Sequence, residues 1–141
     1  MATKADFTTD EWTALHLGVT GSGMLVSLSD RDLSDSFGES TAMAKYLAGQ
    51  VTAGETQLVR EIAGVKGTGF GFTTSPQKLR DETMAALQAS IATLGAKAAD
   101  EVEPYRRLVL GVARTVAEAK GGVTPIETSM IDAITTALGV E

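Results

Sequence analysis

The sequence predicts an all-α fold, a single bundle of six to seven helices over residues 1–141, and three observations support this. Apolar residues recur at the three- and four-residue spacing of helix faces. Serine, threonine, proline and glycine interrupt these stripes where helices would start and stop. No long stretch alternates apolar and polar residues as a half-buried strand would. A chain of this length is typical of one domain.

The first helix begins near residue 8. Thr8 and Glu11 have the spacing of a capping box, and Phe7 and Trp12 have that of a hydrophobic staple. Two apolar stripes follow, which predict a helix buried on more than one side. The first stripe contains Trp12, Leu15, His16, Val19, Gly23 and Val26, and the second contains Leu17, Gly21, Met24, Leu25 and Leu28.

Small residues on this first helix, chiefly Gly18, Gly21 and Gly23, lower its helix propensity. We interpret them as permitting the close approach of a neighbouring helix backbone. With two apolar faces available, one of them is also a candidate surface for a partner, including a second copy of the chain.

Two further helices complete the first half. Ser36 and Glu39 have capping-box spacing at the start of the second helix, and a third, shorter helix follows Gly54. The side chains expected to face inward on the second helix are Phe37, Thr41, Ala44, Leu47 and Val51. Those expected to face inward on the third are Leu58, Val59, Ile62 and Val65.

A glycine-rich linker near residues 64–74 separates the two helical halves. The fourth helix is predicted to start at Ser75-Pro76 and to end near Lys97 or Ala98. The fifth starts at Glu103-Pro104, and the last starts at Thr124-Pro125 and ends at Gly139. The clearest inward stripe, on the fifth helix, contains Tyr105, Leu108, Val109, Val112, Ala113 and Val116.

Composition excludes several classes of function. The net charge of −6, with no cluster of basic residues, argues against nucleic acid as a partner. The chain has no cysteine, so it has no disulfide, thiol nucleophile or thiolate metal site. No apolar run reaches the roughly 20 residues that a membrane span needs. The first residues do not resemble a signal peptide, so we expect a cytoplasmic location.

An acidic turn is the best candidate for a metal site. Asp30, Asp32, Asp35 and Glu39 supply the oxygen ligands that Ca²⁺ or Mg²⁺ prefers. The spacing is not that of an EF-hand, since Arg31 intrudes. The alternative is purely structural: the acidic residues cap the next helix and interact favourably with its positive N-terminal end.

Other candidate residues have simpler interpretations. His16 shares a face with Trp12 and is predicted to be a core or edge histidine. Asp100, Glu101 and Glu103 precede a helix, where acidic residues are stabilising. The segment from Lys66 to Gly71 lacks the Gly-Lys-Ser/Thr ending of a phosphate-binding P-loop. An enzyme would need carboxylates paired by the fold, such as Glu39 facing Glu61.

The C-terminal part carries a family resemblance. Val116-Ala117-Glu118-Ala119-Lys120-Gly121-Gly122-Val123-Thr124-Pro125-Ile126-Glu127, followed by Leu138-Gly139, resembles the tellurite-resistance TerB-like family over residues 105–140. A fainter echo lies at residues 25–40. The resemblance implies a small all-helical domain of two related halves, a link to stress and tellurite resistance, and metal binding by acidic turn residues.

Departures from the family pattern weaken the metal assignment. Lys120 stands at the position of a turn aspartate, Arg31 replaces a glycine, and Phe37 stands where a glutamate is expected. Among the positions that match, Asp30, with Asp32 beside it, would carry the metal-binding property.

No nucleophile–base pair is visible in the sequence, so the leading hypothesis is a non-enzymatic helical binding or scaffold protein. Its partner would be another protein or a second copy of the chain, and the resemblance links it to stress or tellurite resistance. The alternative is a divalent-cation sensor that uses the acidic turn at residues 30–39.

Overall fold

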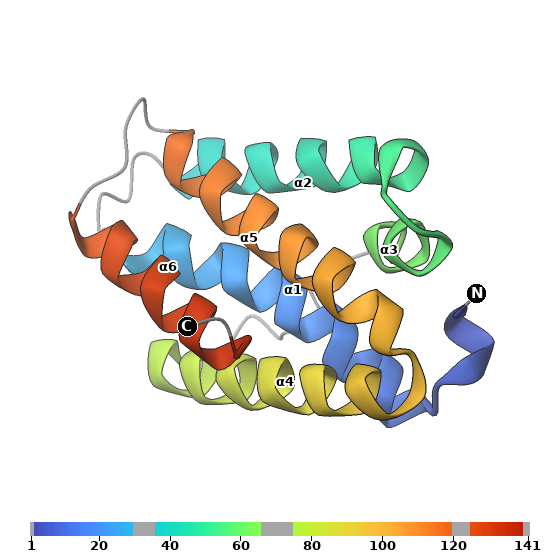
Figure 1. Cartoon of the computed structure of the whole chain (residues 1–141). Helices are drawn as coiled ribbons and strands as arrows, with labels where there is room; N and C mark the ends of the chain where they lie inside the picture. Colours follow the sequence, from blue (N-terminus) through green and yellow to red (C-terminus); the bar gives the residue numbers. More distant parts are fainter. Residues whose placement is uncertain (1, 30–35, 66–74, 120–124, 140–141) are drawn as a thin grey trace.

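The computed structural model describes residues 2–29, 36–65, 75–119 and 125–139, without the side chains of residues 28–29, 36–41 and 76. Within these residues the chain forms six α-helices and no strand, which confirms the predicted all-α class (Figure 1). The helices are α1 (Thr9–Ser29), α2 (Ser36–Ala53), α3 (Gln57–Ala63), α4 (Pro76–Lys97), α5 (Val102–Glu118) and α6 (Pro125–Ala137). Two short 3₁₀ helices, η1 (Lys4–Asp6) and η2 (Ala99–Glu101), precede α1 and α5.

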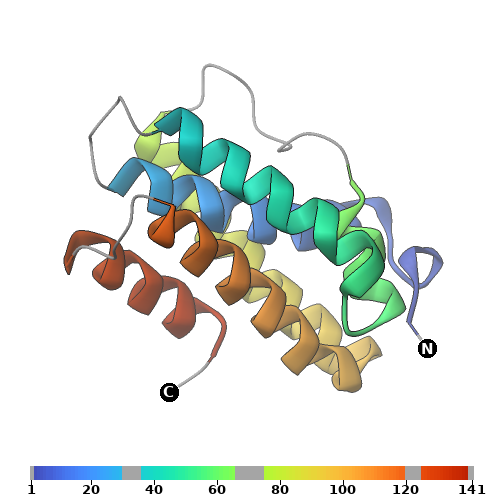
Figure 2. The ribbon, with the colours of Figure 1, turned by 90° about the horizontal axis from the view of Figure 1, so that it is seen from above.

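Helix α1 is the centre of the bundle. It contacts each of the other five helices, most extensively α4 and α5 (Figures 1 and 2). Leu15, Val19 and Val26 on its first stripe are at most 1% exposed, and Leu25 on the second stripe is also buried. Burial on more than one side is therefore confirmed. Because these four residues are buried within the chain, they do not themselves offer a surface to a partner.

The small residues of α1 accommodate side chains rather than a neighbouring backbone. A Cβ atom at residue 18 would clash with the Tyr105 hydroxyl oxygen, and one at residue 21 would clash with the Thr83 hydroxyl oxygen. Tyr105 lies on α5 and Thr83 on α4, and both are fully buried. The expected close approach is thus real, but the groups that make it are the polar tips of buried side chains.

The predicted start of α1 is confirmed in detail. Thr8 N donates to Glu11 Oε1 at 2.8 Å, and Glu11 N donates to Thr8 Oγ1 at 3.2 Å. Phe7 and Trp12, the staple pair, are both 9% exposed. Serine at position 75 caps α4 as predicted, because its hydroxyl accepts a hydrogen bond from Lys78 N.

The predicted inward face of α2 is wrong in part. Ala44 is exposed and Val51 is 43% exposed, whereas Met43 is buried against the core. A Cβ atom at Gly23 of α1 would lie 2.5 Å from Met43 Sδ, so Met43 fills the space that this glycine leaves. The packed face of α2 is therefore rotated from the predicted one. Phe37 and Thr41 lie outside the residues whose side chains are described.

Helix α5 follows its predicted stripe more closely. All six predicted inward residues of α5 are buried, as are Ile134 and Leu138 toward the C-terminus. Arg106 Nε donates to the Leu138 carbonyl oxygen at 2.8 Å, which satisfies an acceptor just beyond the end of α6. Gly139 follows with a φ of 76°, the left-handed conformation that glycine tolerates best.

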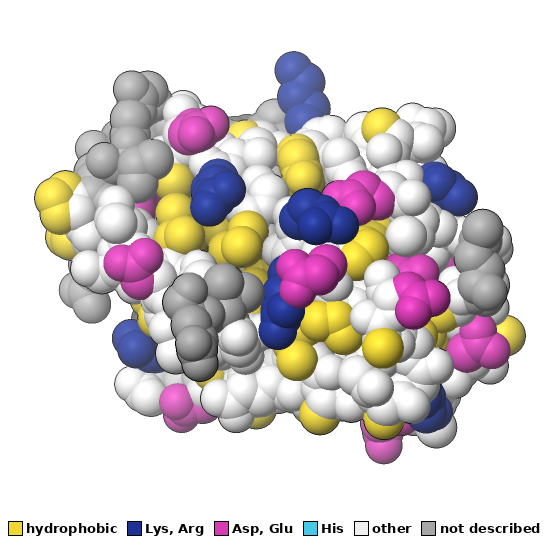
Figure 3. Space-filling view, in the orientation of Figure 1, with side chains coloured by type: hydrophobic (Ala, Val, Ile, Leu, Met, Phe, Trp, Pro, Cys, Tyr) yellow, Lys and Arg dark blue, Asp and Glu magenta, His cyan; other side chains and the backbone are white. Residues whose placement is uncertain are grey.

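The face that carries α5 and α6 mixes basic, acidic and scattered apolar side chains (Figure 3). Among the described residues, Ile126 on α6 is a large apolar side chain that is 57% exposed. None of the described helices is long and apolar enough to traverse a lipid bilayer.

Candidate functional site

The acidic turn proposed as a metal site lies largely outside the described residues. Asp30, Asp32 and Asp35 belong to an undescribed segment, and Glu39 lies on α2 without a described side chain. Among the residues that are described, no three acidic or histidine side chains are placed to hold a metal ion together. The Ca²⁺ or Mg²⁺ site therefore stays a prediction from the sequence.

Two other sequence candidates have structural positions. His16 is 7% exposed and lies inside the bundle on α1, in agreement with a core histidine. Glu61, which an enzyme site would need to face Glu39, accepts hydrogen bonds from Gln57 Nε2 and from Lys4 N. Residues 66–71 of the glycine-rich segment lie outside the described part of the chain.

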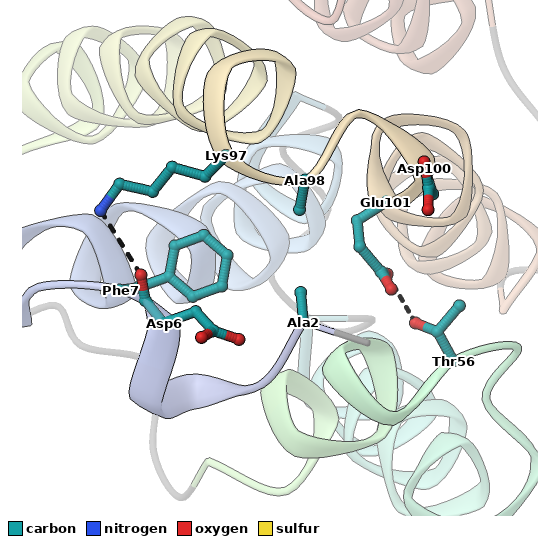
Figure 4. Close-up of a pocket in the computed structure, with 8 residues that line it drawn as sticks. All are labelled: Ala2, Asp6, Phe7, Thr56, Lys97, Ala98, Asp100 and Glu101. Carbon is teal, nitrogen blue, oxygen red and sulfur yellow. Dashed lines mark hydrogen bonds between the residues drawn. The ribbon is translucent and has the colours of Figure 1, made fainter.

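The start of α3 and the end of α4 lie at the end of the bundle that carries the N-terminus (Figure 1). A pocket opens there among η1, the start of α3, the end of α4 and η2 (Figure 4). Its volume is about 740 Å³. Its lining combines a small apolar part with carboxylates, a hydroxyl and one ammonium group. The residues that line it are Ala2, Asp6, Phe7, Thr56, Lys97, Ala98, Asp100 and Glu101.

Glu101 is the most deeply placed charged residue of this pocket. It is only 5% exposed, although it lies on a 3₁₀ helix at the end of the bundle. Its Oε2 atom accepts a 2.7 Å hydrogen bond from the hydroxyl of Thr56 (Figure 4). No described cation lies within ion-pair distance of its carboxylate. Its Oε1 atom accepts no hydrogen bond from a described residue and is not fully buried, so it faces the open volume of the pocket.

Thr56 connects this carboxylate to the start of α3. The threonine is the N-cap residue of α3, and its Oγ1 atom accepts a hydrogen bond from Val59 N at 3.2 Å. The same oxygen carries the proton that it donates to Glu101. One hydroxyl therefore both caps a helix and orients the buried carboxylate.

Lys97 contributes the ammonium group of the pocket, but that group is already engaged. Its Nζ atom lies 2.6 Å from Glu11 Oε1 and 3.4 Å from the carbonyl oxygen of Asp6. The hydrogen bond from Lys97, followed by that from Thr8 N, lowers the pKa of the Glu11 carboxyl below its ordinary value. Lys97 and Glu11 thus neutralise one another at the edge of the pocket.

The remaining carboxylates leave the pocket with an excess of negative charge. Asp6 Oδ2 accepts a 2.8 Å hydrogen bond from Thr3 N, and Asp100 is exposed beside Glu101. Within the described part of the chain, neither aspartate forms an ion pair. Because Lys97 is paired with Glu11, no cation among the lining residues balances the three carboxylates of Asp6, Asp100 and Glu101.

Asp100, Glu101 and Glu103 lie at the start of α5, as the sequence predicts. Glu103 lies in the first turn of α5 and pairs with Arg106. Glu101 makes no capping hydrogen bond to α5 and turns instead toward Thr56. The sequence does not reveal this pocket, because its polar residues come from three separate segments of the chain.

The geometry is that of a concave site with one buried acidic group, and it lacks a histidine or a thiol among its lining residues. Comparison of the chain with known protein families, with characterised proteins and with solved structures gives no match.

Proposed function

We propose that this chain is a non-enzymatic binding protein whose ligand is a small molecule held in the pocket between η1, α3 and η2. The observation that carries the proposal is Glu101, a carboxylate that is 5% exposed and lines an open volume of about 740 Å³. Ligand pockets span roughly 300–1,000 Å³ and combine apolar walls with a few placed polar groups. The volume of this pocket lies in that range, and its lining is richer in charged groups than is usual.

A binding role accounts for the lining better than a catalytic one. The hydroxyl nearest to a carboxylate, that of Thr56, is held as the cap of α3 by Val59 N. Nucleophilic catalysis needs an activated nucleophile and a base that a third group orients. The Thr56 hydroxyl and the Glu101 carboxylate are in contact as a nucleophile and a base would be. However, the threonine oxygen accepts the hydrogen bond that caps α3, and Lys97 is paired with Glu11.

A fragment screen monitored by thermal unfolding tests the proposal. Ala98 lines the pocket, so Ala98→Phe fills its volume; Ala92→Phe places the same ring on an exposed position of α4 as the matched control. We expect fragments that raise the Tm of the unaltered chain to do so for Ala92→Phe and to fail for Ala98→Phe. Amide shifts in a labelled sample should change around Thr56 and Glu101.

A screen without hits in any charge class would overturn the proposal. So would hits that stabilise Ala98→Phe as strongly as the unaltered chain. If Ala98→Phe does not fold, the amide chemical shifts of the unaltered chain provide the test. Shift changes confined to α6, for example, would show that the fragments bind outside this pocket.

The relation to the TerB-like family is likewise a proposal. Its support is the all-helical fold and the pairing of α5 with α6, the two helices that make up most of the resembling segment. Growth of cells with and without this chain under tellurite tests the stress-related role that the resemblance implies. Equal growth at every tellurite concentration would count against that role.

A further inference from the structure

The charge distribution of the pocket identifies the class of ligand that would fit it. We infer that the ligand is a linear aliphatic diamine, with one ammonium group at Glu101 and the other at Asp6. This inference rests on the proposed function, because it assumes that the pocket is the binding site.

The first step is the sign of the charge. Asp6, Asp100 and Glu101 line the pocket, while the single cation there, Lys97, is 2.6 Å from Glu11. An anionic ligand would face three carboxylates, and a neutral one would displace water from the Glu101 carboxylate without supplying a counter-charge. A cation removes that cost, so the pocket favours positively charged ligands.

The second step distinguishes a metal ion from an organic cation. Hard metal ions require six or more converging oxygen ligands or ordered waters. The carboxylates of this pocket do not converge on one point. In the described part of the chain, no three acidic or histidine side chains lie close enough together to hold a metal ion. An ammonium group needs only one to three hydrogen-bond acceptors, because it carries three N–H donors.

The third step is the arrangement of the acidic groups. In Figure 4 the Asp6 carboxylate and the Glu101 carboxylate lie on either side of the pocket, and Ala2 lies between them, with Ala98 opposite. The lining is thus acidic at two ends and apolar in the middle. A chain of methylene groups with an ammonium at each end has the complementary pattern.

Glu101 has acceptor capacity left for the ligand. Its Oε2 atom receives the Thr56 hydroxyl proton, and no hydrogen bond involves its Oε1 atom within the described residues. Asp6 similarly receives one backbone hydrogen bond, from Thr3 N to its Oδ2 atom. Each carboxylate can therefore accept an ammonium hydrogen bond without losing the bond that orients it.

Isothermal titration with probes of one length tests the inference. The probes are 1,4-diaminobutane, butylamine, 1,4-butanediol and succinate, with CaCl₂ and MgCl₂ as inorganic cations. We expect the diamine to bind best and butylamine to bind more weakly. The diol, the dicarboxylate and the metal ions should not bind at this site.

Charge-neutralising variants locate the ammonium groups. Glu101→Gln and Asp6→Asn should each weaken diamine binding about ten- to a hundredfold, the usual worth of a hydrogen bond to a charged group. Asp132→Asn makes the same change in net charge at an exposed position of α6 and should leave the affinity unchanged. Circular dichroism and Tm confirm that each variant is folded, and Asp6→Asn carries the test if Glu101→Gln is not.

Equal diamine affinity in Glu101→Gln, Asp6→Asn and Asp132→Asn would overturn the inference, because binding would then reflect net charge alone. Binding of the diol or of succinate but not of the diamine would also overturn it, while leaving a small-molecule site in place. Failure of every probe, together with an empty fragment screen, would instead remove the proposed function itself.

Discussion

The Tyr105 hydroxyl of α5 occupies the space that a side chain at residue 18 of α1 would need, and it donates a 2.8 Å hydrogen bond to the carbonyl oxygen of Leu15 on α1. A phenol that is fully buried requires a partner for its O–H group. Because residue 18 is glycine, the Tyr105 ring approaches α1 closely enough for its hydroxyl to reach that carbonyl oxygen. The contact fixes the crossing of the two central helices.

Adding a methyl group at this crossing should destabilise the fold. In Gly18→Ala the new Cβ clashes with the Tyr105 oxygen and lies 3.0 Å from Leu87 Cδ2. Overpacking of this kind costs about 1–3 kcal/mol in the free energy of unfolding, measured by urea denaturation. The matched control is Gly95→Ala on α4, where nothing lies within 4 Å of the added Cβ. There, the higher helix propensity of alanine should stabilise the chain by up to about 1 kcal/mol.

Removing the phenol oxygen with Tyr105→Phe should partly restore the stability of the Gly18→Ala variant. Tyr105→Phe alone loses one hydrogen bond, a net cost of about 0.5–1.5 kcal/mol. In the double variant the clash with the hydroxyl disappears, since Tyr105 Cζ lies at an ordinary 3.6 Å from the added Cβ, and only the 3.0 Å contact with Leu87 Cδ2 remains tight. The two changes should therefore cost less together than the sum of their separate effects. Additive costs would show that the hydroxyl is not the obstacle.

Local patterns in the sequence predicted the helices well, for a physical reason. The capping box of Thr8 and Glu11 and the stripe of α5 depend on residues three or four apart, whose relative positions a helix fixes by itself. The inward face of α2 was misplaced because small residues such as Ala44 and Ala48 fit either side of a helix. Only the packing of Met43 against Gly23 decides which side is buried.

The pocket could not be predicted in this way. Thr56 and Glu101 are separated by 45 residues, and their contact depends on how α3 lies against η2. One local signal was present: Asp100 and Glu101 directly follow the C-terminus of α4, where the helix dipole disfavours acidic groups. The same two residues also precede α5, where acids are favoured, so the signal was ambiguous.

The two tyrosines should ionise late as the pH rises. Burial raises the pKa of Tyr105 far above its ordinary value, and partial burial, followed by the nearby Glu55 carboxylate, raises the pKa of Tyr46. An unfolded chain releases these protons near pH 10, whereas the native chain retains them. Stability is thus complete below about pH 10 and falls above it.

Tyrosinate absorbance during an alkaline titration checks this expectation. In the unaltered chain the last tyrosine should ionise only as the chain unfolds. Tyr105→Phe should remove that late step and leave the ionisation of Tyr46, which occurs while the chain is folded. A late, unfolding-linked step that persists in Tyr105→Phe would contradict the assignment.

Acid should weaken the link between α1 and α4. The pKa of Glu11 is lowered by Lys97, so the unfolded chain takes up a proton at a higher pH than the native chain. The stabilisation is therefore present above the ordinary value of 4.5 and is lost as the pH falls through the lowered value. Lys97→Met should flatten the dependence of Tm on pH in this acidic range.

The control for that experiment is Lys78→Met. Lys78 and Glu82 form an ion pair of 3.8 Å on α4, with side chains 65% and 43% exposed. Such pairs contribute little to stability. This variant should keep the slope of the unaltered chain, and an equally flattened slope would attribute the acid sensitivity to general charge rather than to Glu11.

Thr56 should prove indispensable to the geometry of the pocket because its hydroxyl has two roles. Thr56→Val preserves the shape of the side chain but removes the cap of α3 and the only hydrogen bond that Glu101 receives from the described residues. The lost cap costs about 1 kcal/mol, and a buried acceptor left unsatisfied costs about 1–3 kcal/mol more. Thr56→Ser retains both hydrogen bonds and should lose far less stability in urea denaturation.

If Glu101→Gln, which removes the buried charge, is introduced together with Thr56→Val, part of the lost stability should be recovered. No recovery would mean that the helix cap alone accounts for the effect of Thr56, and that Glu101 reaches water rather than depending on this hydroxyl.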